Sequence, residues 1–113
     1  MEQMDRLWPE GPVFYYDDTL FKPGTDAFLL GAFARPRAGD RVCDLGAGTG
    51  LIGLLLLARE PSLALHNVEL QAAPLRLAEQ TAAANGLAVS QHLADLRQLE
   101  GILPAGGMDY VVS

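Results

Sequence analysis

The segment that decides the fold of this chain is Arg41-Val42-Cys43-Asp44-Leu45-Gly46-Ala47-Gly48-Thr49-Gly50-Leu51. A short apolar run ends in an acid, passes three glycines spaced by two residues, and continues into an apolar stretch typical of a helix. This order predicts a strand, a tight glycine-rich loop and the N-terminus of a helix. In open α/β folds, such an arrangement forms a ligand site at the end of the strand.

The spacing of the glycines narrows the class of ligand. A dinucleotide-binding fingerprint has glycines at its first, third and sixth places, and the sixth place counted from Gly46 is Leu51. A phosphate-binding P-loop ends in Gly-Lys-Ser or Gly-Lys-Thr, and the chain's only lysine is Lys22. Asp44 before the loop would repel phosphates and attract a cation. The segment therefore favours a cationic ligand and argues against a nicotinamide oxidoreductase.

Two further acids end predicted strands. Glu69 lies 19 residues after Gly50, and Asp95 follows the segment Val89–Ala94. An acid about 20 residues past the glycines can accept hydrogen bonds from both ribose hydroxyls. Because the ends of parallel strands face one crevice, we expect the three acids around one ligand. Asp44 could bind an ammonium group, Glu69 a ribose and Asp95 an exocyclic amine. S-adenosylmethionine carries all three groups.

The chain resembles the class I S-adenosylmethionine-dependent methyltransferases from Arg41 to Ser113, in the order Asp-x-Gly-x-Gly-x-Gly, then Glu, then Asp. Upstream, the segment Phe21–Phe33 contains Gly-Thr-Asp-Ala-Phe-Leu-Leu-Gly-Ala. It resembles the Gly-Thr-Asp-x-x-Leu-Leu-Gly-Ala stretch of bacterial tRNA adenine-N6 methyltransferases that modify a valine tRNA beside its anticodon. The resemblance implies S-adenosylmethionine as cofactor and tRNA as the substrate of the full-length parent.

The resemblance also implies roles for single residues. Asp44 and the glycine loop would hold the methionine end of the cofactor. Glu69 would hold the ribose, and Asp95 would hold the adenine amine. Thr25 and Asp26 would lie beside cofactor and substrate. The cofactor-binding set is then Asp44, Gly46, Gly48, Gly50, Glu69, Asp95, Thr25 and Asp26. Purely structural roles compete with these: an N-cap for Asp44, a helix start for Asp95, and a helix cap for Thr25 or Asp26.

The chain departs from the family at its end. The family's catalytic tetrad, Asn-Pro-Pro followed by Tyr or Phe, comes directly after the fourth strand. Here that strand reads Met108–Ser113, and Ser113 is the last residue. We therefore expect the cofactor half of an enzyme, with no catalytic residue in this chain and no activity of the chain alone. An unpaired apolar edge at Tyr110–Val112 would also favour self-association.

The expected fold is a Rossmann-like class I methyltransferase α/β fold, with a parallel sheet truncated after strand 4 and a small N-terminal hairpin and helix cap. We assign residues 1–40 to this cap and residues 41–113 to the cofactor-binding domain. Residues 1–12 are expected to be poorly ordered. The expected elements are a hairpin of 13–16 with 19–21, helices at 27–34, 50–59 and 72–85, and strands at 41–45, 64–69, 89–93 and 109–113.

Composition sets limits on partners and location. The chain has 14 acidic and 8 basic residues and a net charge of −6, which argues against this segment as the main nucleic-acid surface. The single cysteine, Cys43, suits a reducing cytoplasm. The apolar run Leu51–Ala58 is too short to cross a bilayer, and no signal peptide is visible. His66 and His92 without a third ligand do not predict a metal site.

The favoured interpretation is an S-adenosylmethionine-dependent methyltransferase acting on an adenine N6 in tRNA. One alternative is a non-catalytic cofactor-binding module, either a fragment or half of a split protein. Another is a protein glutamine N5-methyltransferase, which has the same tetrad. The Gly24-Thr25-Asp26 segment argues against the glutamine enzyme.

Overall fold

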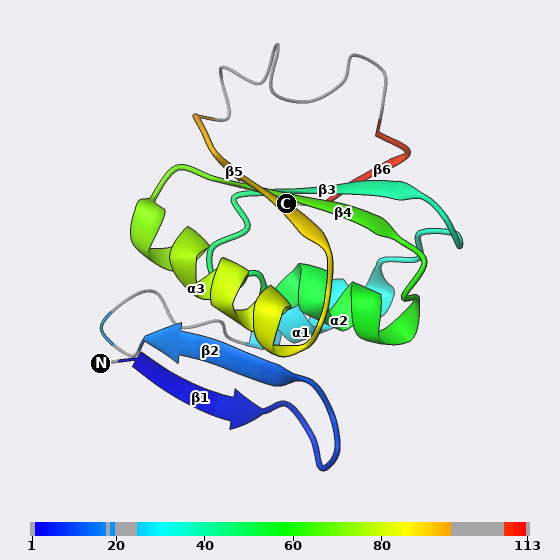
Figure 1. The fold of residues 1–113 in the computed structure, drawn as a ribbon. Coiled ribbons are helices and arrows are strands. Elements are labelled where there is room, and N and C mark those ends of the chain that lie inside the picture. The colour runs from blue at the N-terminus through cyan, green and yellow to red at the C-terminus, as the bar shows by residue number, and fades with distance from the viewer. Residues whose placement is uncertain (1, 18, 20–24, 96–107, 113) are drawn as a thin grey trace.

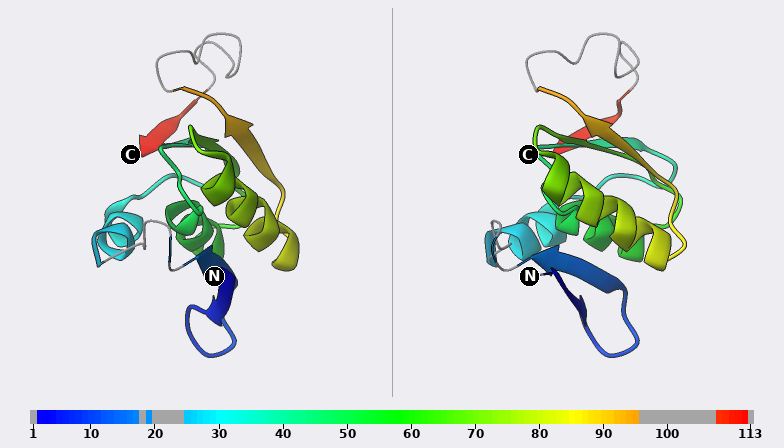
Figure 2. Two further views of the ribbon diagram at one scale, coloured as in Figure 1. Left: turned by 90° about the vertical axis from the view of Figure 1, so that its left-hand side faces the viewer. Right: turned by 60° about the vertical axis from the view of Figure 1, so that its left-hand side comes forward.

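The computed structural model describes residues 2–17, 19, 25–95 and 108–112 (Figure 1). Its central element is a parallel sheet in the order β5-β4-β3-β6. The strands are β3 (Arg41–Leu45), β4 (Ala64–Glu69), β5 (Val89–Leu93) and β6 (Tyr110–Val112). The helices are α1 (Thr25–Phe33), α2 (Leu51–Arg59) and α3 (Ala72–Ala84). Helices α2 and α3 cover one face of the sheet, and an N-terminal hairpin lies beyond α3 (Figures 1 and 2).

The alternation of strands and helices confirms the predicted Rossmann-like α/β fold. Strands β3, β4 and β5 have the predicted bounds. Helix α2 begins at Leu51 because Gly50 has a left-handed φ of 83° and ends the loop as the helix N-cap. Helix α3 ends at Ala84, and Gly86 follows with a left-handed φ of 66°, which is typical of the residue that ends a helix.

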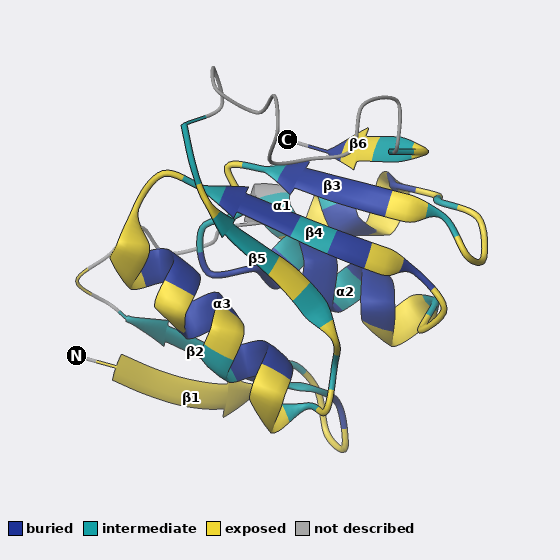
Figure 3. Cartoon of the chain, turned by 45° about the horizontal axis from the view of Figure 1, so that its top comes forward, coloured by how far each residue is buried: buried dark blue, intermediate teal, exposed yellow. Residues whose placement is uncertain are grey.

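The core lies between the sheet and the two covering helices, where buried residues of both layers meet (Figure 3). Val42 and Leu56 are fully buried, and Leu65 is 3% exposed. Gly53 lets α2 approach the sheet closely, because a Cβ atom there would overlap the side chain of Leu65. The structure therefore supports a packing role for Gly53.

We expect Gly53→Val to destabilise the fold without touching the glycine loop. The added side chain must displace Leu65, and overpacking a core of this kind costs about 1–3 kcal/mol of unfolding free energy. Urea unfolding followed by circular dichroism measures the loss. In the double variant Gly53→Val with Leu65→Ala, the shorter residue 65 leaves room for valine, so the unfolding free energy should be higher than in Gly53→Val alone. Equal losses in the single and double variants would contradict the packing role.

The N-terminal hairpin differs from the prediction. Strand β1 (Glu2–Arg6) pairs antiparallel with β2 (Val13–Asp17), so the expectation of poor order is wrong for residues 2–6, and β1 is a hairpin partner of residues 13–17 that was not predicted. All five residues of β1 are exposed, which leaves no apolar alternation from which a strand could be predicted. The proposed second strand at 19–21 falls mostly outside the described residues.

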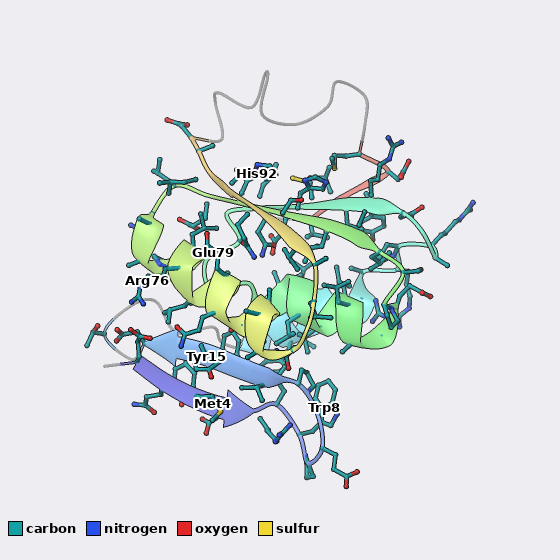
Figure 4. The ribbon with its side chains drawn as sticks, in the orientation of Figure 1. Met4, Trp8, Tyr15, Arg76, Glu79 and His92 are labelled. Carbon is teal, nitrogen blue, oxygen red and sulfur yellow. The ribbon has the colours of Figure 1, made fainter. Side chains whose placement is uncertain are left out.

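Helix α3 anchors the hairpin through backbone bonds of β2. The Tyr15 N–H donates to Thr81 Oγ1 at 2.9 Å, and the Val13 N–H donates to Asn85 Oδ1 at 2.8 Å. Figure 4 shows Tyr15 on the strand nearest this helix. The division into domains at residue 40 remains a prediction. In the ranges that the structure describes, no helix has the length and apolar character that a membrane span requires.

Candidate functional site

The glycine loop lies over the carboxyl ends of β3 and β4. Gly46, Gly48 and Gly50 have φ angles of 73°, 57° and 83°, a conformation that residues with a Cβ adopt only with strain. The Gly46 and Ala47 N–H groups both donate to the Val68 carbonyl, at 2.8 and 3.0 Å. A Cβ atom at Gly46 or Gly48 would meet nothing within 4 Å. The loop is thus fixed to β4 and open on its outer side.

Asp44 is a buried carboxyl group beneath this loop. Its side chain is 1% exposed, and its Oδ2 atom has no hydrogen-bond partner among the described residues. Burial, with a further contribution from the charge of Glu69, raises the pKa of Asp44 to about 7. The N-cap of α2 is Gly50, without a side-chain bond, so the alternative of Asp44 as a helix cap is wrong. Such a group can hold a cation that reaches it.

Glu69 ties the loop to the end of β4. Its Oε1 accepts a hydrogen bond from the Gly48 N–H at 2.8 Å, and its Oε2 accepts one from the Gln71 N–H at 2.8 Å. Sequence reasoning missed both bonds, because they depend on how the loop folds back over the neighbouring strand. A carboxylate has about four acceptor positions, so Glu69 retains capacity for hydroxyl donors of a ligand.

The remaining predicted site residues are Asp95, Thr25 and Asp26. Asp95 is partly buried and follows Ala94, whose N–H donates to the Glu69 carbonyl at 3.0 Å. This bond brings Asp95 to the same edge of the sheet as Glu69 and Asp44. Thr25 and Asp26 form the first turn of α1, and their side chains fall outside the described part of the chain.

Two histidines meet on the sheet face away from α2 and α3, where Figure 4 labels His92. His66 Nδ1 and His92 Nε2 are 3.0 Å apart, and the two rings stack. Burial, and next the neighbouring His92, lowers the pKa of His66. Sequence reasoning treated the two as isolated, since their contact depends on the register of β4 and β5. Within the described residues, no group of three His, Cys, Asp or Glu side chains is placed to hold a metal ion.

Comparisons with known proteins agree on one family. The family described as methyltransferase small domain matches residues 13–113. A tRNA1(Val) (adenine(37)-N6)-methyltransferase of Aeromonas hydrophila is 42% identical over 71 residues, covering 62% of this chain and 30% of that protein. The protein of the same name from Cronobacter sakazakii is 39% identical over 85 residues, covering 73% of this chain and 35% of that protein. The chain therefore spans about a third of the length of these relatives.

Solved structures agree with these matches. TrmN from Thermus thermophilus has a TM-score of 0.61 and 32% identity, covering 69% of this chain and 24% of that one. The M. jannaschii TYW2, solved in complex with AdoMet, has a TM-score of 0.79 and 19% identity, covering 97% of this chain and 49% of that one, a likeness of fold alone. With the match over residues 13–113, the chain belongs to the methyltransferase small domain family.

Proposed function

We propose that this chain binds S-adenosylmethionine at the carboxyl edge of β3, β4 and β5. The observation that carries the proposal is the buried Asp44 carboxyl, whose Oδ2 lacks a partner among the described residues, beneath a left-handed glycine loop that Glu69 holds. S-adenosylmethionine presents an ammonium group and a ribose, which match a buried carboxylate and a neighbouring acid. The cofactor supplies an activated methyl group when it is bound.

Each residue has a defined task in this proposal. Asp44 attracts the ammonium of the methionine end, because a charge pair is strong where water is excluded. The loop between Gly46 and Gly50 lets the backbone approach the ligand closely. Glu69 accepts bonds from the ribose hydroxyls while it keeps its bond to Gly48. Asp95 accepts from the adenine amine, and Thr25 and Asp26 lie beside cofactor and substrate.

The methyl acceptor that we propose is the N6 atom of an adenine in tRNA. The Gly24-Thr25-Asp26 segment and the names of relatives about 40% identical support this acceptor. The relatives are named for adenine 37 of tRNA1(Val). The net charge of −6 argues against these 113 residues as the main surface for RNA phosphates.

Calorimetry with S-adenosylhomocysteine tests the cofactor site on this chain. We expect saturable binding, whereas NAD and ATP, which the loop spacing excludes, should give none. The acceptor is tested separately with the protein made from its complete gene, tritium-labelled S-adenosylmethionine and a tRNA1(Val) transcript. A transcript with guanine in place of adenine 37 should remain unlabelled. Absence of S-adenosylhomocysteine binding would refute the site, and equal labelling of both transcripts would refute the acceptor.

We expect the affinity for S-adenosylhomocysteine to fall as pH drops below about 7. The pKa of Asp44 is raised to about 7, and only the ionised carboxylate attracts the ammonium. Each pH unit below that value should weaken binding by about tenfold, and above it the affinity should level off. In Asp44→Asn, which has the same shape, binding should be weak and nearly independent of pH. A wild-type affinity that is flat across this range would contradict the role of Asp44.

The free protein should show the opposite trend in stability. The pKa of Asp44 is higher in the folded state, at about 7, than its ordinary value of 3.8. Below about pH 4 Asp44 is protonated in both states and does not weaken the fold. As pH rises through 7 the buried carboxyl must ionise, so the unfolding free energy falls. The difference in unfolding free energy between the wild type and Asp44→Asn, measured in urea at several pH values, isolates this contribution.

A further inference from the structure

Three polar side chains form a row across the sheet beneath the glycine loop. Asp44 on β3 is paired in register with Asn67 on β4, which is paired with Gln91 on β5. Residues paired in this way point to the same face of a parallel sheet. Asn67 is 2% exposed and adjoins Gly50 and Ala78, so the row faces α2 and α3. A polar row at this depth needs internal partners.

Each residue of the row has one buried atom without a partner among the described residues: Asp44 Oδ2, Asn67 Oδ1 and Gln91 Nε2. The one bond within the row runs from Asn67 Nδ2 to Gln91 Oε1, at 3.2 Å. Because the amide nitrogen of Asn67 faces β5, its oxygen faces away from β5. This arrangement suits a protonated Asp44, whose hydroxyl can donate to an amide oxygen. It does not suit an ionised Asp44, which only accepts.

Turning both amides by 180° changes which atoms can pair. An amide keeps its shape in this rotation, since its oxygen and nitrogen exchange places. Gln91 Nε2 then donates to Asn67 Oδ1, and Asn67 Nδ2 faces away from β5, on the side of the row where its register partner Asp44 lies and would accept from it when ionised. The rotation pairs Gln91 Nε2 with Asn67 Oδ1 and turns a donor toward the strand of Asp44, while the Gln91 oxygen takes the place that its nitrogen leaves. The row can therefore accommodate both charge states of Asp44.

We propose that Asn67 is a positioning residue for Asp44, and that the amides of Asn67 and Gln91 turn over when Asp44 loses its proton. The ionised arrangement is the one that a cationic ligand selects, so this inference rests on the proposed cofactor site. The charged group that acts on Asp44 from β4 is Glu69, and on β3 its neighbour is the Cys43 thiol. The helices contribute the uncharged Gly50 and Ala78 beside the row.

Carbon-detected NMR titration of the Asp44 carboxyl in the free protein tests the proposal. In Asn67→Leu, which is similar in size, the titration midpoint should rise by about one pH unit, because the charged form loses a charge-assisted donor. Gln91→Leu should raise it less. The affinity for S-adenosylhomocysteine near pH 7 should fall about fivefold in Asn67→Leu, because the ionised fraction of Asp44 falls, and should recover partly at higher pH. Asn85→Leu, at a structural asparagine that bonds β2, should leave the midpoint unchanged.

The wild type supplies a readout that needs no substitution. The side-chain amide protons of Asn67 and Gln91 should shift with the same midpoint as the Asp44 carboxyl, and those of Asn85 should not. The proposal would be overturned if the amide chemical shifts of Asn67 did not change as Asp44 titrates. An unchanged Asp44 midpoint in a folded Asn67→Leu or Gln91→Leu would overturn it too. Linked titration in a protein that does not bind S-adenosylhomocysteine would uphold the positioning role and refute the cofactor site instead.

Discussion

Glu69→Ala is expected to weaken S-adenosylhomocysteine binding by roughly tenfold to a hundredfold. A carboxylate that accepts hydrogen bonds from a ribose contributes about 1.5–3 kcal/mol, because such bonds are charge-assisted. The structure adds a second reason, since the same carboxylate accepts the N–H groups of Gly48 and Gln71. Its removal would take away the proposed ligand contact together with an anchor of the loop. Calorimetry on the wild type and the variant measures the change.

Glu69→Gln separates the two contributions. Glutamine keeps the shape of the side chain but has no charge and one acceptor oxygen. It can therefore accept a hydrogen bond from the Gly48 N–H or from the Gln71 N–H, but not from both as the carboxylate does. We expect an affinity between those of the wild type and Glu69→Ala. The ¹⁵N resonance of Gly48 reports whether the loop bond survives. An unchanged affinity in Glu69→Ala would remove Glu69 from the ligand site.

The parts of the fold that could be predicted are those that the local sequence determines. The strand 41–45, the glycines and the strand 64–69 each carry their own pattern, and the structure has them at the predicted bounds. The acids Asp44 and Glu69 were expected at neighbouring strand ends, and the pairing of β3 with β4 places them there. Chain order alone was enough for this, because consecutive parallel strands end at the same edge.

The parts that could not be predicted depend on contacts between distant residues. Strand β1 has no buried residue and forms through its ladder with β2. The stacking of His66 on His92 follows from the register of β4 and β5, which no local pattern reveals. The bond from Gly48 to Glu69 requires the loop to close over the next strand. The sequence predicted a ligand role for Glu69, which stays a prediction, and did not predict its bonds to the N–H groups of Gly48 and Gln71.

Gly48→Val is expected to abolish S-adenosylhomocysteine binding while the fold is retained. Position 48 has φ 57° and open space around a Cβ atom, so it requires glycine because of its backbone conformation and not because a side chain would not fit. Valine resists this left-handed backbone at a cost of about 1–3 kcal/mol. Relaxing the strain would move the Gly48 N–H away from Glu69, and the new side chain would occupy the outer side of the loop, where we propose that the ligand approaches.

Gly39→Val is the matched control for this variant. Gly39 has φ 80° and open space around a Cβ atom, and it lies before the amino end of β3, at the opposite edge of the sheet from the loop. Both substitutions introduce the same kind of backbone strain and should lower the urea midpoint by similar amounts. Only Gly48→Val should lose binding in calorimetry, by at least about a hundredfold. Equal affinities in the two variants and the wild type would mean that the ligand does not rest on this loop, since strain alone would then account for every effect of the substitution.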